Sequence, residues 1–176
     1  MIIIFGGRGI IKDIDEFLSM MHRFSKDQDL VMQAFDAQMI FGKDHLISAV
    51  SHAQRAFKQS TNATNSLSLE ILLYAAGERQ IQKAIKKMGV KQGKQTVAFV
   101  LIDERNKTKN SKWYSTKINT LLRLILFTRD DTILEGNHSK LKRFGISARE
   151  IHSLPASKLG DIILERVAMV DVIKKR

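Results

Sequence analysis

The stretch EILLYAAGERQIQKAI, from Glu70 to Ile85, joins an almost wholly apolar run to a strongly two-sided one at a single glycine. Residues 67–76 are apolar nearly all round, which is typical of a helix buried in a core. After Gly77, at about 100° per residue, cationic residues fall on one side of a second helix and apolar residues on the other. The two sets are Arg79, Lys83, Lys86 and Lys87, and Ile81, Ala84, Ile85 and Met88. The pattern predicts a buried helix followed by a basic surface helix that ends at Gly89.

The charge of the chain is concentrated in and after this basic helix. The formal net charge is +11, from 29 Lys and Arg residues and 18 Asp and Glu residues. Residues 79–117 contain eleven of the basic residues and only two acidic ones. A region of this density favours nucleic acid or another polyanion as a partner, and a solvated basic surface has the same composition.

Length and composition indicate one globular domain spanning 1–176. The chain has 176 residues, of which 44% are hydrophobic and 27% charged. A chain of this length and composition can bury a core without disulfides or structural metals. It contains no cysteine, which excludes disulfides, thiolate metal sites and cysteine nucleophiles. The first residues lack the form of a signal peptide, and the apolar runs are far shorter than the ~20 residues that span a bilayer. We expect a cytoplasmic protein with no membrane segment.

Hydrophobic periodicity predicts a mixed α/β (α+β) fold, with a small sheet of about three to five strands surrounded by a majority of helices. Expected strands cover 2–5, 30–41, 96–102 and 132–135, with 96–102 in the centre. The first would end in a turn at Gly6-Gly7-Arg8-Gly9. Expected helices begin near Asp13, Gly42, Leu67, Gln80, Ile118, Asn137 and Ser157. The polar, lysine-rich segment 103–115 is expected to be a loop.

No motif indicates a catalytic, metal or cofactor site. The Gly6-Gly7-Arg8-Gly9 run lacks the third glycine of a dinucleotide-binding loop and the Lys-Ser/Thr ending of a phosphate-binding loop. His45 and His52 are seven apart on one helical side, but no further metal ligand accompanies them, so we expect hydrogen-bonded or solvated imidazoles. The acidic groups Asp130-Asp131 and Asp13-Asp15-Glu16 sit at expected turns and helix starts, where charge and capping explain them. A dispersed active site would leave no motif and stays open.

The last predicted helix is apolar on two sides. Besides a core-facing stripe, it carries an outer stripe of Leu164, Ala168 and Val172, mixed with Asp161, Glu165 and Asp171. A helix of this kind is either deeply buried or docked against a partner. The acidic residues in the outer stripe favour an exposed contact with a basic partner.

Four segments carry a resemblance to a known family. They are Phe35-Asp36-Ala37, Phe41-Gly42-Lys43 with His45-Leu46, the run from Glu70 to Ile85, and Leu164-Glu165-Arg166-Val167-Ala168. In these segments the chain resembles the TPRKB family of PRPK-binding proteins. The resemblance covers almost the whole chain and is poorest at 103–115, which is longer here than in the family's pattern.

The resemblance implies a noncatalytic accessory subunit of the KEOPS complex, which makes threonylcarbamoyladenosine in tRNA. Such a subunit docks on the small lobe of the complex's atypical kinase, captures the 3′ CCA end of tRNA, and meets the other KEOPS subunits indirectly. By position, the RNA-binding residues would be Tyr74, Gly77, Arg79, Gln80, Ile81, Lys83, Lys86 and Lys87. The kinase-binding residues would be Leu164, Ala168 and Val172, and no cofactor is implied.

Two other functions remain compatible with the residues. One is a purely structural regulator of the kinase whose basic surface binds no RNA. The other is an enzyme that acts on RNA, with a site that no motif reveals. The side chains of Tyr74 and Ile81 have two interpretations as well, because either residue could line an RNA-end pocket or belong to the core.

Overall fold

The TVAFVLI segment lies at the centre of a four-stranded antiparallel sheet, as predicted. In the computed structural model, which describes residues 1–105 and 109–174, strand β3 (Gly93–Ile102) pairs with β2 (Val31–Asp36) on one side and β1 (Ile2–Ile11) on the other. The short strand β4 (Thr128–Arg129) extends the sheet beyond β1. Both faces of a central strand are covered by core side chains, and residues 97–102 of β3 are accordingly all buried.

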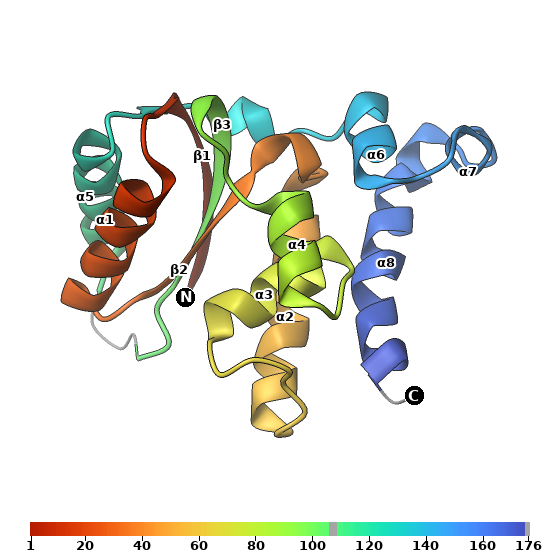
Figure 1. Ribbon diagram of the computed structural model, residues 1–176, viewed down its shortest axis with the longest axis horizontal. Helices are drawn as coiled ribbons and strands as arrows, with labels where there is room; N and C mark the ends of the chain where they lie inside the picture. Colours follow the sequence, from red (N-terminus) through yellow and green to blue (C-terminus); the bar gives the residue numbers. More distant parts are fainter. Residues whose placement is uncertain (106–108, 175–176) are drawn as a thin grey trace.

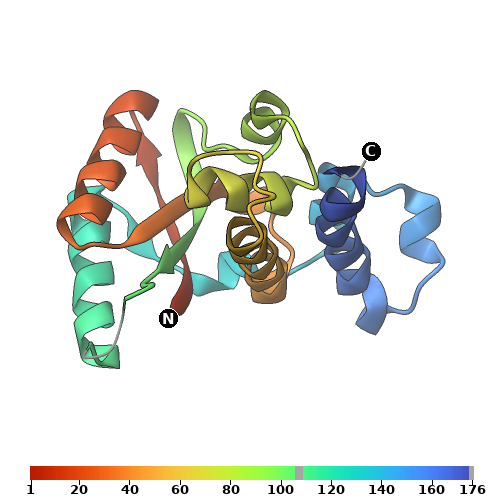
Figure 2. The same ribbon diagram turned by 90° about the horizontal axis from the view of Figure 1, so that it is seen from below.

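Helices cover both faces of this sheet, and the α+β class is confirmed (Figures 1 and 2). On one face lie α1 (Ile14–Asp27) and α5 (Ser111–Leu124), over a core that includes Phe5, Phe99 and Leu101. On the other face lie α2 (Gly42–Lys58) and α3 (Leu67–Ala76), over a larger core. The faces alternate along each strand because successive side chains point to opposite sides.

The remaining helices extend the second layer away from the sheet (Figure 1). Helix α4 (Ile81–Met88) follows α3, and α6 (His138–Phe144), α7 (Ala148–His152) and α8 (Leu159–Lys174) form the carboxy-terminal part. Helix α8 contacts both α2 and α3. Among the described residues, no helix is long and apolar enough to cross a membrane.

The prediction of a turn at Gly6-Gly7-Arg8-Gly9 is wrong, because β1 continues through it to Ile11. Close packing explains why glycine occupies these positions. A Cβ at Gly6 would lie 2.3 Å from the Asp130 carbonyl oxygen, and one at Gly9 would lie 2.2 Å from the Phe127 ring. The glycines let the segment around β4 approach the strand closely.

Four other predicted boundaries differ from the structure. Strand β2 ends at Asp36, whose side chain accepts a hydrogen bond from the Gln38 backbone N–H and starts a 3₁₀ helix, Ala37–Met39. The predicted strand at 132–135 is a 3₁₀ helix, Asp131–Leu134, capped by Asp130. Helix α5 begins at Ser111, where Asn110 caps it, so 111–115 is not a loop; residues 106–108 lie outside the described part. The last helix follows a 3₁₀ turn, Ala156–Lys158, instead of beginning at Ser157.

Several predicted helix ends are confirmed. Asp13 caps α1 by accepting from the Glu16 backbone N–H at 2.8 Å, and Asn137 caps α6 in the same way. Gly77 and Gly145 end α3 and α6 with positive φ values of 65° and 106°. Helix α4 ends at Met88, immediately before Gly89.

Candidate functional site

The corner between α3 and α4 turns at Gly77, directly against α8. The Gly77 and Glu78 backbone N–H groups donate to the carbonyls of Tyr74 and Leu73, closing the end of α3. A Cβ at Gly77 would lie 3.4 Å from the Arg166 carbonyl oxygen of α8. Positive φ and this close approach both favour glycine. The corner therefore holds the start of α4 beside the carboxy-terminal helix.

Helix α4 exposes more than its cationic side. Ala84 and Met88 are buried, as predicted, but Ile81 and Ile85 are 38% and 49% exposed. The prediction that all four apolar residues face the core is therefore wrong for Ile81 and Ile85, because Ala84 and Met88 occupy the sector of α4 that faces the core and the two isoleucines lie to one side of it. The exposed polar residues of α4 and the turn before it are Arg79, Gln80, Gln82, Lys83 and Lys86. This α4 surface thus presents cations and amides, with two exposed isoleucines on the other side of the helix.

Lys87 has a structural role within this corner. Its Nζ donates to the Ala76 carbonyl oxygen at 2.7 Å and lies 3.8 Å from the centroid of the Phe144 ring. Burial lowers the pKa of Lys87, and the nearby Glu78 carboxylate opposes that shift. The ammonium group hydrogen-bonds a carbonyl at the end of α3 and contacts an aromatic ring of α6. Lys87 is therefore less exposed than the other cations of α4.

Tyr74 is a core residue. Its side chain is fully buried, and its hydroxyl donates a short hydrogen bond to Asp171 of α8. Burial, with the hydrogen bond to Asp171, raises the pKa of the tyrosine. The ring also packs against His52, with centroids 5.4 Å apart. Of the two interpretations open for Tyr74, the structure supports the core, whereas for Ile81 it supports the surface.

A polar network around Asp171 joins α8 to α2 and α3. One carboxylate oxygen lies 2.7 Å from His52 Nδ1 and accepts from Arg55 Nη2 at 3.1 Å, and the other accepts from Tyr74. Burial alone would raise the pKa of Asp171, but hydrogen bonds from Tyr74 and His52 lower it overall. Asp171, one of the acidic residues of the outer stripe, therefore bonds within the fold.

The outer stripe of α8 is accessible. Val172 is 50% exposed, Ala168 is exposed and Leu164 is half-buried. Met169, which the sequence reasoning missed, adds a 38% exposed side chain beside them. Its position three residues before Val172 was a usable signal, because residues three apart lie on the same side of a helix.

The histidines do not assemble into a metal site. His45 is buried between the Phe41 backbone N–H and the Ala75 carbonyl oxygen, while His52 belongs to the Asp171 network. Both are hydrogen-bonded, as predicted, and to different partners. In residues 1–105 and 109–174, no group of three or more His, Asp or Glu side chains could hold a metal ion.

Comparisons with known proteins give one consistent result. A family model described as kinase binding protein CGI-121 matches residues 11–171. The regulatory protein Cgi121 of Methanocaldococcus jannaschii is 29% identical over 147 residues, which cover 83% of this chain and 87% of that protein. The matched region runs from the end of β1 to the last turns of α8, and so includes both the α4 surface and the outer stripe.

Proposed function

Because the chain belongs to the kinase binding protein CGI-121 family, we propose that it is a noncatalytic accessory subunit of the KEOPS complex. It binds the small lobe of the complex's atypical kinase and recruits tRNA by its 3′ CCA end for threonylcarbamoyladenosine synthesis. It does so in the cytoplasm and meets the other KEOPS subunits indirectly. The family name supports the kinase partner and an accessory, regulatory role.

The exposed surface of α4 carries the RNA part of the proposal. Single-stranded RNA is held by cations that contact phosphates and by apolar or aromatic groups that contact bases. Arg79, Lys83 and Lys86 are exposed cations, and Ile81 and Ile85 are exposed apolar side chains on the other side of the same short helix. Gln80 offers both donors and acceptors to a base edge. Lys87 and Tyr74 act behind this surface, holding α3, α6 and α8 in place.

The outer stripe of α8 carries the kinase part. A half-exposed Val172 with Ala168, Met169 and Leu164 forms an apolar strip with acidic neighbours such as Glu165. Apolar strips of this kind are typical of partner contacts. The strip and the α4 surface lie on neighbouring elements that meet at Gly77 and Arg166, which allows both partners to be bound at once.

A charge reversal on α4 tests the RNA part. We expect Arg79→Glu with Lys83→Glu to weaken binding of intact tRNA by about tenfold or more at low salt and to reduce the salt dependence, because two phosphate contacts are lost. Binding is measured by fluorescence anisotropy with intact tRNA and with tRNA trimmed of its CCA end. The trimmed tRNA should bind the wild-type protein weakly and respond little to the variant.

Arg23→Glu with Lys26→Glu on α1 is the matched control, because it reverses two exposed charges on the opposite layer. Kinase co-purification reports that each variant is folded. Equal tRNA affinity in the α4 variant and the control would refute the RNA part and leave the alternative function, a structural regulator that binds no RNA.

A further inference from the structure

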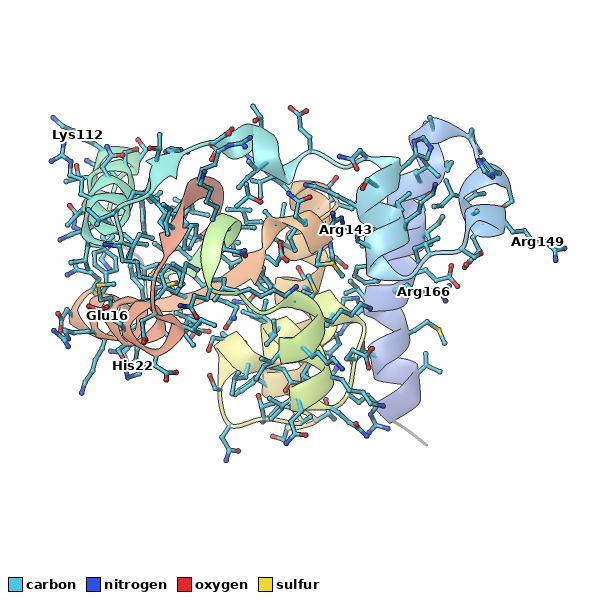
Figure 3. All side chains as sticks on the ribbon, turned by 45° about the horizontal axis from the view of Figure 1, so that its top comes forward. Glu16, His22, Lys112, Arg143, Arg149 and Arg166 are labelled. Carbon is cyan, nitrogen blue, oxygen red and sulfur yellow. The ribbon has the colours of Figure 1, made fainter. Side chains whose placement is uncertain are left out.

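A second basic surface lies where the α4–β3 connection, the sheet and α6 meet. A hollow of about 650 Å³ opens there, lined by basic side chains from four segments and by polar side chains of the sheet. The basic residues are Arg8 of β1, Lys91 before β3, Lys94 of β3 and Arg143 of α6. Figure 3 shows Arg143 extending from α6 toward the centre of the molecule. None of these residues belongs to the α4 surface described above.

The positive charge of the hollow is only partly balanced. Among the described residues that line it, Asp36 is the one acidic residue, and its Oδ2 lies 3.5 Å from Lys91 Nζ. Arg8 forms an ion pair with Asp130. Within the described ranges, Lys94 and Arg143 have no carboxylate within 4.0 Å. Two cations therefore converge on one concave surface without a protein counter-ion, which favours an anionic ligand.

The size of the hollow and its mixed lining, in which Ile10 lies among polar side chains, indicate more than a bare anion. Pockets for small organic ligands are roughly 300–1,000 Å³, so a single phosphate would fill only part of this hollow. Gln38 donates to the Thr96 hydroxyl at 3.1 Å, which holds one amide in place at the wall, and Gln95 lies beside it. Amides and hydroxyls provide the donors and acceptors that a sugar or base requires. Phosphate, sugar and base together make a nucleotide.

The hollow lies near the end of α4. Lys91 follows α4 by three residues, and β3 begins two residues later. Lys87 of α4 lies over the ring of Phe144, whose neighbour Arg143 lines the hollow. Because α4 spans only two turns, roughly 12 Å, a strand lying along it would reach from one basic surface to the other.

We propose that this hollow binds one nucleotide, with Lys94 and Arg143 on its phosphate and the Gln38–Thr96 wall beside its sugar and base. The nucleotide is either a unit of the RNA strand whose 3′ end lies at α4 or a free nucleotide. The RNA strand as the source of the nucleotide rests on the proposed function, whereas the presence of a nucleotide site does not. The experiment therefore has one arm for each source.

In the RNA arm, a single-stranded RNA ending in CCA is titrated against the wild-type protein, Lys94→Glu with Arg143→Glu, and the Arg23→Glu with Lys26→Glu control. The affinity of Lys94→Glu with Arg143→Glu, called the hollow variant below, should fall by about tenfold at low salt. The slope of log affinity against log salt should decrease by about 0.7, since both cations contact one phosphate and each single-strand phosphate contact contributes roughly 0.7. Lys94→Ala with Arg143→Ala should give a smaller change in the same direction. Both residues are exposed, and far-ultraviolet circular dichroism checks the fold of each variant.

In the second arm, adenosine 5′-monophosphate is added to the wild-type protein while the amide signals of Gln95 and Thr96 are followed by NMR. Saturable shifts that disappear in the hollow variant support a free nucleotide. If neither arm distinguishes the hollow variant from the control, the proposal is wrong. Failure of the proposed function is seen separately, as insensitivity of RNA binding to CCA removal and to Arg79→Glu with Lys83→Glu.

Discussion

His45 shows at the scale of one residue how burial selects a protonation state. The Phe41 backbone N–H donates to His45 Nδ1 at 3.3 Å, and Nε2 lies 2.9 Å from the Ala75 carbonyl oxygen. Only the neutral ring with its proton on Nε2 satisfies both contacts. A second proton would place two donors against each other at Nδ1. Burial accordingly lowers the pKa of His45 from 6.5 to about 4.

This histidine should make stability depend on pH between 6.5 and about 4. In that range the unfolded chain binds a proton that the folded chain does not, so the free energy of unfolding decreases as the pH falls, by up to about 3 kcal/mol. His45→Gln keeps a donor and an acceptor but does not titrate. Urea unfolding from pH 7 to pH 4 should therefore show a smaller decrease in the variant, whatever its stability at pH 7. An unchanged pH dependence would contradict the buried neutral imidazole.

At the scale of one element, β1 depends on glycines for packing and not for turning. Gly9→Ala places a methyl group into the Phe127 ring, which itself packs between Phe17 and Phe99. We expect a loss of about 1–3 kcal/mol in the free energy of unfolding, measured by urea denaturation, because overpacking displaces the ring. Gly160→Ala in α8 is the control. Its Cβ would meet only an ordinary contact at 3.7 Å and should cost nothing or stabilise the helix. Equal stabilities of the two variants would refute the packing explanation.

Local patterns in the sequence predict what local physics determines. The apolar spacing of α2 and α3, the caps at Asp13 and Asn137, and the strand at 96–102 depend on neighbours along the chain, and all were predicted. The role of Gly9 was not, because a turn and a close approach require the same residue, and Phe127 is far away in sequence. The exposure of Ile81 and the hollow around Lys94 likewise depend on which segments meet in space.

At the scale of the whole molecule, α8 connects the two proposed binding surfaces. One side of it holds the Gly77 corner and, through Asp171, contacts Tyr74, His52 and Arg55. The other side presents Ala168, Met169 and Val172. Since Asp171 is held to buried Tyr74 and the α4 surface contains neither residue, changes to the outer stripe need not disturb that surface. The two surfaces are therefore expected to be separable by mutation.

The kinase contact tests this separation. Leu164→Glu with Val172→Glu should reduce kinase affinity by about 100-fold or more, because two carboxylates would be buried in an apolar interface without partners. Affinity is measured by co-purification and calorimetry with the kinase, and Leu124→Glu, an exposed position of α5, is the control. Binding of CCA-ended RNA should be unchanged, because no residue of the α4 surface is altered. A folded variant that keeps the kinase would remove the outer stripe from the interface. Loss of RNA binding along with the kinase would show instead that α8 couples the two surfaces through the Asp171 network.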